Sequence, residues 1–394
     1  MRGRVVIVGA GIIGAACART LARRGLDVTI IDRGAAAGGT SSSGEGNLLV
    51  SDKAPGAELE LAKYSLGLWR TLGPVLAAET GQDFPFLEFE CKGGIVAALD
   101  PQQSQALDFF AERQRHAGVD AQLLSVDEAL CLEPELSPTI TSAVYYPQDA
   151  QVQPTVATES FLASARAAGT RVLVDTVVTG PLLDAGGKLV GVVTSQGSVA
   201  ADHVVVAAGP WSGAVAEKLG GTLSVAPRKG CLLVTARMPH RIFHKVYDAD
   251  YVGAVGSDNQ VLQTSTVIEA TVAGTVLIGS SRQHVGFDAD LDVEPLRAMA
   301  AKAVRLMPFL RETSVIRTYC GFRPFARDHV PVIGQDPRVA GLWYAAGHEG
   351  AGIGLAPATA EILAALICGE QPAVAAAPFA PGRASLTAAH AGTA

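Results

Sequence analysis

The sequence predicts a mixed α/β (α+β) fold, in which a Rossmann-like nucleotide-binding domain is assembled from discontinuous segments and a largely antiparallel substrate domain is inserted between them. Three glycine-rich segments support this fold: residues 5–14, 207–212 and 341–358. The strand-like runs between them, broken by frequent turns, are typical of an antiparallel sheet. The expected boundaries are 1–50, 150–220 and 319–377 for the nucleotide-binding domain, 51–149 and 221–318 for the substrate domain, and 378–394 for a disordered tail.

The first glycine segment has the pattern of a dinucleotide-binding turn. An apolar run at residues 5–8 leads into G-x-G-x-x-G at Gly9, Gly11 and Gly14, and apolar residues then recur at helical spacing. Gly9 permits the turn, Gly11 lets the backbone approach a pyrophosphate, and Gly14 lets the helix pack on the strand. A second apolar run ends in Asp32, about 20 residues further on, where a ribose hydroxyl needs an acceptor. Phosphate charge would meet the N–H groups of the helix N-terminus; the alternative is an ordinary strand–helix turn.

Composition excludes several classes of protein. The chain of 394 residues is long enough for two or three domains, and its 43 glycines and 18% charged residues are typical of a compact globular enzyme. A net charge of -7 without a basic cluster argues against a nucleic-acid partner. The six cysteines are scattered without a C-x-x-C pair, so we expect neither a metal site nor a disulfide framework.

The N-terminal region and the apolar stretches bear on location. Arg2 and Arg4 precede an apolar stretch, but the glycine spacing and the arginines at 19, 23 and 24 do not fit a secretory signal, so we expect a cytoplasmic protein. Every apolar stretch of about 18 residues is interrupted by charges or prolines. We therefore expect no membrane span, whereas peripheral contact with the inner face of the membrane stays open.

Helical and strand-like periodicities alternate between the glycine segments. Helices are predicted at residues 58–79, 101–117, 154–168 and 293–306, and strands at residues 93–99, 171–174, 177–182, 189–194 and 199–208. The run at 204–208 ends at Gly209 and is expected to return to the first sheet. Residues 223–278 contain further strand-like runs, which we expect in the antiparallel sheet.

The third glycine segment distinguishes between nucleotide cofactors. A predicted strand ends near Ala346, a loop follows with the sequence Gly347-His348-Glu349-Gly350-Ala351-Gly352, and a helix is expected through about Cys368. The N-terminus of such a helix places N–H dipoles against a ring that develops negative charge, as a reduced flavin does. An enzyme that uses NAD would need only the first glycine segment, so the third segment favours FAD.

Residues 5–47, 204–212 and 319–358 resemble the FAD-dependent D-amino acid oxidase superfamily, especially glycine oxidase and sarcosine oxidase, and the likeness covers nearly the whole chain. Residues 39–53, 244–247, 278–282 and 285–288 are most similar to a narrower group, which contains D-hydroxyproline dehydrogenases, opine oxidase subunits and the flavin subunit of hydrogen cyanide synthase. These features separate substrates poorly. The resemblance implies FAD as the cofactor and a small amino or imino acid as the substrate.

The resemblance also indicates residues that contact the substrate. Gly321-Phe322-Arg323-Pro324 matches G-L-R-P of glycine oxidase, in which the arginine holds the substrate carboxylate. A planar guanidinium suits that role because it offers two parallel charge-assisted bonds; the alternative for Arg323 is an interdomain salt bridge. Arg282 and Asn47 are candidates for the pocket wall by position. Tyr251 is a candidate hydroxyl donor or a strand aromatic, and His348 either influences the flavin electrostatically or is satisfied by backbone.

The three segments and the resemblance together imply a set of FAD contacts. The expected residues are Gly9, Gly11, Ile12, Ile13, Gly14, Asp32, Arg33, Thr40, Ser41, Ser42, Gly46, Asn47, Leu48, Val178, Ala208, Gly209, Trp211, Arg323, His348, Glu349, Gly350, Ala351, Gly352 and Ile353. Sarcosine oxidase carries a cysteine-linked flavin, but Cys320 lies one residue out of register, so we predict non-covalent FAD. Gly350 replaces an arginine of glycine oxidase, which leaves substrate size open.

The predicted function is oxidative dehydrogenation of a small amino or imino acid by hydride transfer from the alpha carbon to flavin N5, which gives an imine. The favoured substrate is hydroxy-D-proline or D-proline; the alternatives are a glycine/sarcosine oxidase that produces hydrogen peroxide, or an opine oxidase-type subunit. The third segment opposes an NAD(P)-dependent dehydrogenase, and Arg323 opposes a catalytically idle flavoprotein subunit. Oxidation of a 2-hydroxy acid, the electron acceptor (oxygen or an electron-acceptor protein), small partner subunits and homo- or hetero-oligomerisation are left open.

Overall fold

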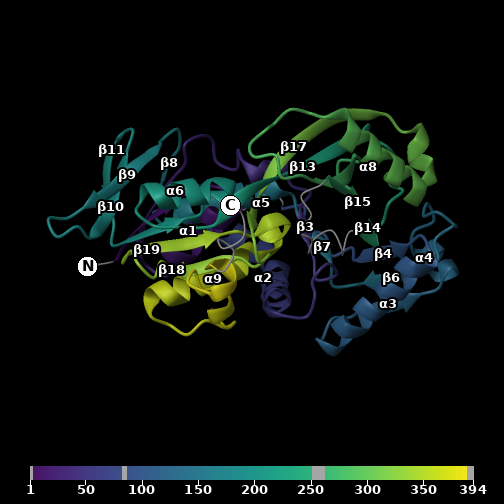
Figure 1. Cartoon of the computed structure of the whole chain (residues 1–394), viewed down its shortest axis with the longest axis horizontal. Helices are drawn as coiled ribbons and strands as arrows, with labels where there is room; N and C mark the ends of the chain where they lie inside the picture. The colour runs from purple at the N-terminus through teal and green to yellow at the C-terminus, as the bar shows by residue number, and fades with distance from the viewer. Residues whose placement is uncertain (1–2, 82–86, 251–261, 388–394) are drawn as a thin grey trace.

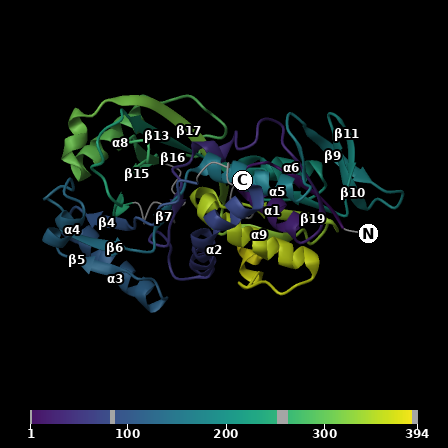
Figure 2. The same ribbon diagram turned by 180° about the vertical axis from the view of Figure 1, so that it is seen from behind.

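The computed structural model describes residues 3–81, 87–250 and 262–387. Its fold is mixed α/β, as predicted, with a six-stranded sheet and an eight-stranded sheet as its two main sheets. In Figure 1 the six-stranded sheet, with α1 (Ile12–Arg23), α5 (Pro154–Ala167) and α9 (Gly352–Cys368), occupies one half of the molecule, and Figure 2 shows the same division from behind. The short ladder of β3 (Asn47–Leu48) and β7 (Ala150–Gln151) lies between the halves.

The six-stranded sheet is parallel except at one edge. Its strands, in spatial order, are β18 (Val332–Gln335), β19 (Leu342–Ala346), β12 (His203–Val206), β1 (Arg4–Val8), β2 (Asp27–Ile31) and β8 (Arg171–Leu173), and only β18 runs antiparallel. Successive side chains of a strand point to opposite faces, so β1 contributes to two cores. Val5 and Ile7 pack with residues of α1, α5 and α9, whereas Val6 and Val8 pack with the three-stranded sheet described next. Burial on both faces explains why this strand is a continuous apolar run.

The predicted strand at residues 199–208 is two strands in the structure. β11 (Gly197–Ala200) belongs to a separate antiparallel sheet with β10 (Leu189–Thr194) and β9 (Val178–Leu183), and the chain turns at Ala201 before β12 begins. β12 then pairs in parallel with β1, as we expected for the return to the first sheet. The apolar run Val199-Ala200-Ala201 at the end of β11 is separated from the valines of β12 by only Asp202 and His203, so hydrophobicity alone does not separate the two strands.

The eight-stranded sheet combines two distant parts of the chain, visible as blue and green strands in Figure 1. Its strands, in spatial order, are β17 (Val315–Ala326), β13 (Val225–Thr235), β16 (Val276–Arg282), β15 (Gln263–Ala270), β14 (Lys245–Asp248), β4 (Gly94–Ala98), β6 (Ser142–Tyr146) and β5 (Gln122–Leu124). Only the β14–β4 pair, which joins the two parts, is parallel among these pairings. Helix α8 (Val293–Leu306) packs on this sheet, and its residues Met299 and Ala303 share a hydrophobic core with residues of the strands.

The other helices complete the two halves. They are α2 (Ala57–Thr80), α3 (Pro101–His116), α4 (Val126–Leu132), α6 (Ser212–Lys218) and α10 (Ala384–Thr387), with 3-10 turns η1 (Thr40–Ser43), η2 (Gly209–Trp211), η3 (Pro308–Glu312), η4 (Glu349–Ala351) and η5 (Ala377–Phe379). Two segments lie across the expected boundaries. α2 packs on α5 and α9 of the nucleotide-binding half, and β17 belongs throughout to the eight-stranded sheet, although we placed residues 319–326 in the other domain.

The expectation of a disordered tail is wrong for residues 378–387. Phe379 is fully buried, and Arg383 binds Asp328 through an Nε–Oδ2 contact of 2.6 Å. Leu386 is also buried. These contacts fold the segment back onto the nucleotide-binding half; residues 388–394 lie outside the described part of the chain.

One helical stretch in the described residues, Glu349–Cys368, is long and apolar enough to cross a membrane by length and composition alone. A core helix passes the same test, which makes the finding weak evidence for a span. Most of the stretch is buried inside the fold, where α9 packs on α1 and α2. This packing accounts for its apolar character without a membrane.

Candidate active site

A cavity of about 420 Å³ opens at the carboxyl ends of β1, β2, β12 and β19, which is where open α/β sheets bind ligands. Residues from all three glycine segments line it, together with residues of β13 and β17 from the eight-stranded sheet. The tertiary fold therefore brings the three segments to one cavity between the two halves of the molecule.

The first glycine segment forms the turn that the motif predicts. Gly9 has a φ of +115°, and a side-chain carbon there would overlap the backbone of Ala207 after β12. Gly14 does not line the cavity; a side-chain carbon there would overlap the Gly9 carbonyl, which is the close packing of helix on strand that we expected. The N-terminus of α1 has no acidic residue in its first turn and no side-chain cap of its own, so its positive end faces the cavity. This end fits a pyrophosphate.

Asp32 and Trp211 lie at the nucleotide end of the cavity. The Asp32 carboxylate accepts hydrogen bonds from the N–H groups of Ala10 (2.7 Å) and Gly34 (3.0 Å), which ties the glycine turn to the end of β2. A carboxylate has about four acceptor positions, so capacity is left for a ribose hydroxyl. The Arg33 guanidinium lies 4.1 Å from the centroid of the Trp211 ring, and Phe287 stacks on that ring at 5.1 Å.

The third glycine segment places a second helix N-terminus at the same cavity. η4 leads directly into α9, whose first turn contains no acidic residue, and Gly352 and Ile353 line the cavity. The helix dipole therefore points at the cavity, where it would face a flavin ring, and α9 packs against α1.

His348 lines this part of the cavity but is uncharged. Its Nε2 atom lies 3.0 Å from Thr359 Oγ1, so a side chain, and not backbone, satisfies it. Burial lowers the pKa of His348 to about 3, so the imidazole is neutral near pH 7. The expected electrostatic influence of His348 is therefore that of a dipole and not of a positive charge.

Arg323 reaches the cavity from β17. It lies directly opposite Arg228 of β13, and a side-chain carbon at Gly230 would overlap its guanidinium, so the glycine makes room for it. Its Nη1 atom donates to the carbonyl of Ser281 at 2.9 Å. The residue is half-buried and lines the cavity, so its guanidinium is positioned to meet a ligand that binds there.

Arg228 forms an ion pair inside the protein. The Arg228 side chain is fully buried and binds Glu349, which also lies 3.1 Å from His329 Nδ1. Burial acts to raise the pKa of Glu349, but His329 and Arg228 outweigh it and lower that pKa. Glu349, which we predicted to contact FAD, lines the cavity with its carboxylate engaged by these two side chains.

Sequence reasoning gave Glu45 no role of its own, although it recognised the motif that contains it. Glu45 lines the cavity beside Asn47, whose Nδ2 atom donates to Glu45 Oε2 at 3.2 Å. Glu45 Oε1 and Asn47 Oδ1 are buried and have no hydrogen-bond partner among the described residues. Burial raises the pKa of Glu45, and the positive charges of Lys245, Arg323 and Arg282 oppose that rise. A lone acid in a run of glycine and serine was the available signal.

Lys245, to which we assigned no chemistry, is buried on β14 and ion-paired with Glu269. Burial lowers the pKa of Lys245 to about 7, with a contribution from the nearby charge of Lys92. Arg282 is also buried; its Nη1 atom donates to Ser265 Oγ at 3.0 Å, and it does not line the cavity. Arg282 therefore stands behind Glu45 and not in the pocket wall that we predicted.

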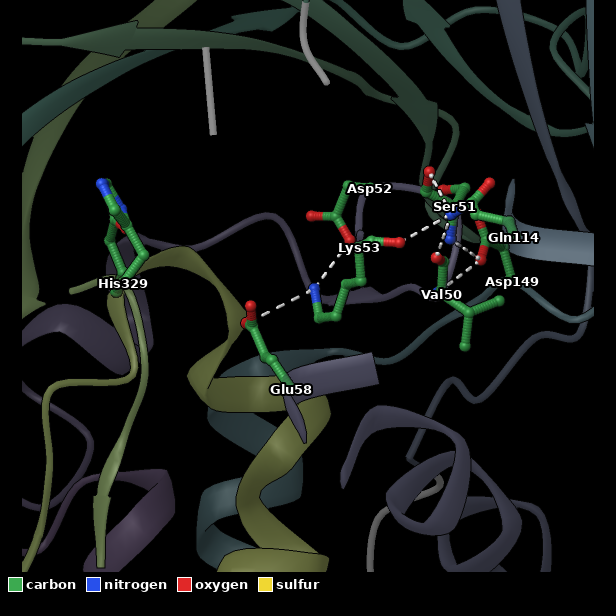
Figure 3. Close-up of polar contacts among 9 residues, drawn as sticks. Val50, Ser51, Asp52, Lys53, Glu58, Gln114, Asp149 and His329 are labelled. Carbon is green, nitrogen blue, oxygen red and sulfur yellow. Dashed lines mark hydrogen bonds and ion pairs between the residues drawn. The ribbon is translucent and has the colours of Figure 1, made fainter. Parts of the chain in front are cut away.

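The loop that follows Asn47 is held by buried polar side chains (Figure 3). The Gln114 amide donates to the carbonyls of Val50, Ser51 and Lys53, and Asp149 accepts from the N–H groups of Val50 (2.9 Å) and Ser51 (3.3 Å). Lys53 Nζ lies 2.7 Å from Asp52 and 3.8 Å from Glu58. Burial raises the pKa of Asp149 to about 7 and that of Glu58 to about 6. This network anchors the chain immediately after Glu45 and Asn47.

Most of the predicted FAD residues line the cavity: Gly9, Gly11, Ile12, Ile13, Asp32, Arg33, Thr40, Ser41, Gly46, Asn47, Val178, Ala208, Gly209, Trp211, Arg323, His348, Glu349, Gly350, Gly352 and Ile353. Ser42 is exposed and does not line it, while Leu48 and Ala351 line a smaller pocket next to it. Tyr251 lies outside the described residues. The contacts of all these residues with FAD stay predictions.

Cys320 is placed away from the cavity wall. Its Sγ atom lies 3.3 Å from the carbonyl of Ala289, and its neighbours Gly321 and Phe322 line the cavity where it does not. This position supports the prediction of non-covalent FAD.

The fold and the cavity are those of a dinucleotide-binding protein, and comparison with known proteins shows that it is an oxidoreductase. Residues 4–366 match the model of a family described as DAO, FAD dependent oxidoreductase. Glycine oxidase of Pseudomonas aeruginosa is 34% identical over 386 residues, covering 97% of this chain and 99% of the relative. The hydrogen cyanide synthase subunit HcnC of the same organism is 29% identical and covers 96% and 95%. The crystal structure of glycine oxidase from Geobacillus kaustophilus superposes with a TM-score of 0.86 at 28% identity, covering 97% and 99%.

The chain belongs to the FAD-dependent oxidoreductase family. The predictions of FAD as cofactor and of an FAD-dependent amino acid oxidoreductase are confirmed at this level. The particular amino acid, the cytoplasmic location and any partner protein stay predictions.

Proposed function

We propose that the protein oxidises a small amino acid of the glycine or sarcosine type, with FAD bound non-covalently across the cavity. The observation that carries this proposal is the position of Arg323, whose guanidinium lies in the cavity wall formed by β17, while the helix N-termini that suit a flavin nucleotide line the same cavity. A guanidinium in this position suits a carboxylate, because it offers paired donors of fixed geometry.

Different residues along the cavity would hold different parts of FAD and of the substrate. The N-terminus of α1 and the turn at Gly9 would hold the pyrophosphate, Asp32 the ribose, and the N-terminus of α9 the side of the flavin ring. When bound, FAD supplies the acceptor for the hydride that leaves the alpha carbon of the substrate. Arg323 would orient the substrate by its carboxylate. His348, neutral and bonded to Thr359, would add a fixed dipole.

The comparisons favour the glycine-type reading over the hydroxy-D-proline reading suggested by the sequence motifs. The relative with 34% identity is a glycine oxidase and spans nearly the whole chain. Hydroxy-D-proline is kept as the second candidate because Asn47 Oδ1, a buried acceptor without a partner among the described residues, could receive a ring hydroxyl.

Anaerobic bleaching of the bound flavin tests both candidates. The holoenzyme is mixed with glycine, sarcosine, D-proline, hydroxy-D-proline, opines and the 2-hydroxy acid glycolate, and the rate of flavin reduction is measured for each. Glycine or sarcosine should bleach the flavin fastest and should yield stoichiometric hydrogen peroxide in air. Faster bleaching by hydroxy-D-proline, with turnover that depends on a dye acceptor, would replace the glycine-type reading. If no amino acid bleaches the flavin, the proposed function is wrong.

A further inference from the structure

We propose that Glu45 binds the amine of the substrate, and that it makes the site select amino acids over carboxylic acids that lack an amine. The inference deepens the proposed function and rests on it. A guanidinium recognises the carboxylate of a 2-hydroxy acid as well as that of an amino acid. Arg323 alone therefore leaves the choice between these substrate classes open, and a second group is required.

Elimination among the acids that line the cavity leaves Glu45. The cavity wall contains the carboxylates of Asp32, Glu45 and Glu349. Asp32 holds the backbone of the first glycine turn at the nucleotide end, and Glu349 is engaged by the side chains of Arg228 and His329. Glu45 has one oxygen bonded to Asn47 and one, Oε1, without a hydrogen-bond partner among the described residues.

The position of Glu45 is fixed by contacts with the strand that carries Arg323. Thr40 Oγ1 donates to the Phe322 carbonyl at 2.6 Å. Ser43 packs closely against Gly321, where any side-chain carbon would lie only 2.5 Å from the Ser43 Cβ. The turn η1, which ends two residues before Glu45, is therefore docked on β17. The Glu45 carboxylate and the Arg323 guanidinium thus reach one cavity from the segment after η1 and from β17, and η1 and β17 are joined by a hydrogen bond.

The backbone also makes room for the free oxygen. A side-chain carbon at Gly279 of β16 would overlap Glu45 Oε1, so the carboxylate occupies a recess that only glycine leaves open. A buried acceptor without a donor costs about 1–3 kcal/mol, more when it is charged, and a bound ammonium or secondary amine would supply the donors.

The local charges favour a zwitterion. Arg323 and Glu45 are a cation and an anion that line the cavity at this end, Lys245 is paired with Glu269, and Arg282, which donates to Ser265, keeps its charge behind the cavity wall. An amino acid adds one negative and one positive charge and leaves the local sum unchanged. A 2-hydroxy acid adds a negative charge near Glu45 and brings no cation for it, which is unfavourable in a partly desolvated site.

The test separates amine recognition from carboxylate recognition in the holoenzyme. For Glu45→Gln, which removes the charge at constant size, anaerobic flavin reduction is measured with the fastest amino acid of the panel, and acetate is titrated by its perturbation of the oxidised flavin spectrum. We expect kcat/KM for the amino acid to fall about 10- to 100-fold, with the Kd for acetate unchanged or lower. Arg323→Leu should weaken both ligands. Glu361→Gln, which removes a carboxylate paired with Arg24 away from the cavity, should change neither.

Two further outcomes keep the inference testable. Glu45→Asp, which keeps the charge on a shorter side chain, should retain more amino acid activity than Glu45→Gln. Full amino acid activity in Glu45→Gln, or a parallel loss of acetate binding, would overturn the role of Glu45 and leave the proposed function standing. A wild-type holoenzyme that no amino acid reduces would instead overturn the proposed function and this inference together.

Discussion

Replacing Arg323 with leucine removes the guanidinium that we assign to the substrate carboxylate. Two charge-assisted hydrogen bonds at about 1.5–3 kcal/mol each set an upper range, and the half-buried position lets water replace part of the loss. The expected cost is about 2–5 kcal/mol in kcat/KM, which is a decrease of roughly 30- to 5,000-fold. The variant also loses the hydrogen bond from Nη1 to the Ser281 carbonyl, so its free energy of unfolding should fall by about 1 kcal/mol.

The assay is steady-state turnover of the best amino acid with the FAD content and melting temperature measured in parallel. FAD content should stay at the wild-type level, because the nucleotide end of the cavity lies at other elements. Arg323→Lys keeps the positive charge without the paired donors, so its kcat/KM should lie between those of the wild type and of Arg323→Leu. Arg305→Leu, at an exposed position on α8, is the matched control. Near wild-type turnover in Arg323→Leu with normal FAD content would refute the assignment and leave Arg323 as a structural residue.

Three further predictions concern the cofactor and the loop behind the site. Gly11→Val should abolish FAD retention in a folded protein, because even a single side-chain carbon there would lie 3.0 Å from Ser41 Oγ, which accepts from the first N–H of α1; wild-type occupancy by absorbance would refute the pyrophosphate assignment. Cys320→Ser should leave FAD content unchanged, and acid precipitation of the wild type should release free FAD; flavin in the pellet would show a covalent link. The raised pKa of Asp149 means that its ionisation costs stability as pH rises from about 4 to about 7, by up to about 4 kcal/mol. Asp149→Asn should therefore be more stable than wild type at pH 8, with an advantage that shrinks towards pH 5; an equal difference in melting temperature at both pH values would contradict this.

The local elements of the site were predictable from the sequence. The turn at Gly9, the packing at Gly14 and the acid at the end of β2 follow from short-range pattern, because strand, turn and helix are set by neighbouring residues. Helix α9 and its glycine-rich start were predictable for the same reason. The family resemblance then indicated Arg323, and the structure places it in the cavity wall.

Domain boundaries were less predictable, because strand pairing joins residues that are distant in the chain. β4 pairs with β14 across about 150 residues of sequence, and no local pattern specifies that partner. β17 continues through the boundary expected at residue 319 because its pairing with β13 extends to Ala326. The order in the tail likewise depends on a distant partner, Asp328, for Arg383.

The sequence by itself determined the class of cofactor site, because glycine spacing and helix starts act locally on the backbone. Only the tertiary structure decided which side chains share the cavity and in what state. Burial makes His348 neutral. Arg282 lies behind the cavity wall, where it donates to Ser265, and one oxygen of Glu45 has no hydrogen-bond partner among the described residues. Desolvation and charge pairing depend on every neighbour in space, so the same residues read along the chain carry no such information.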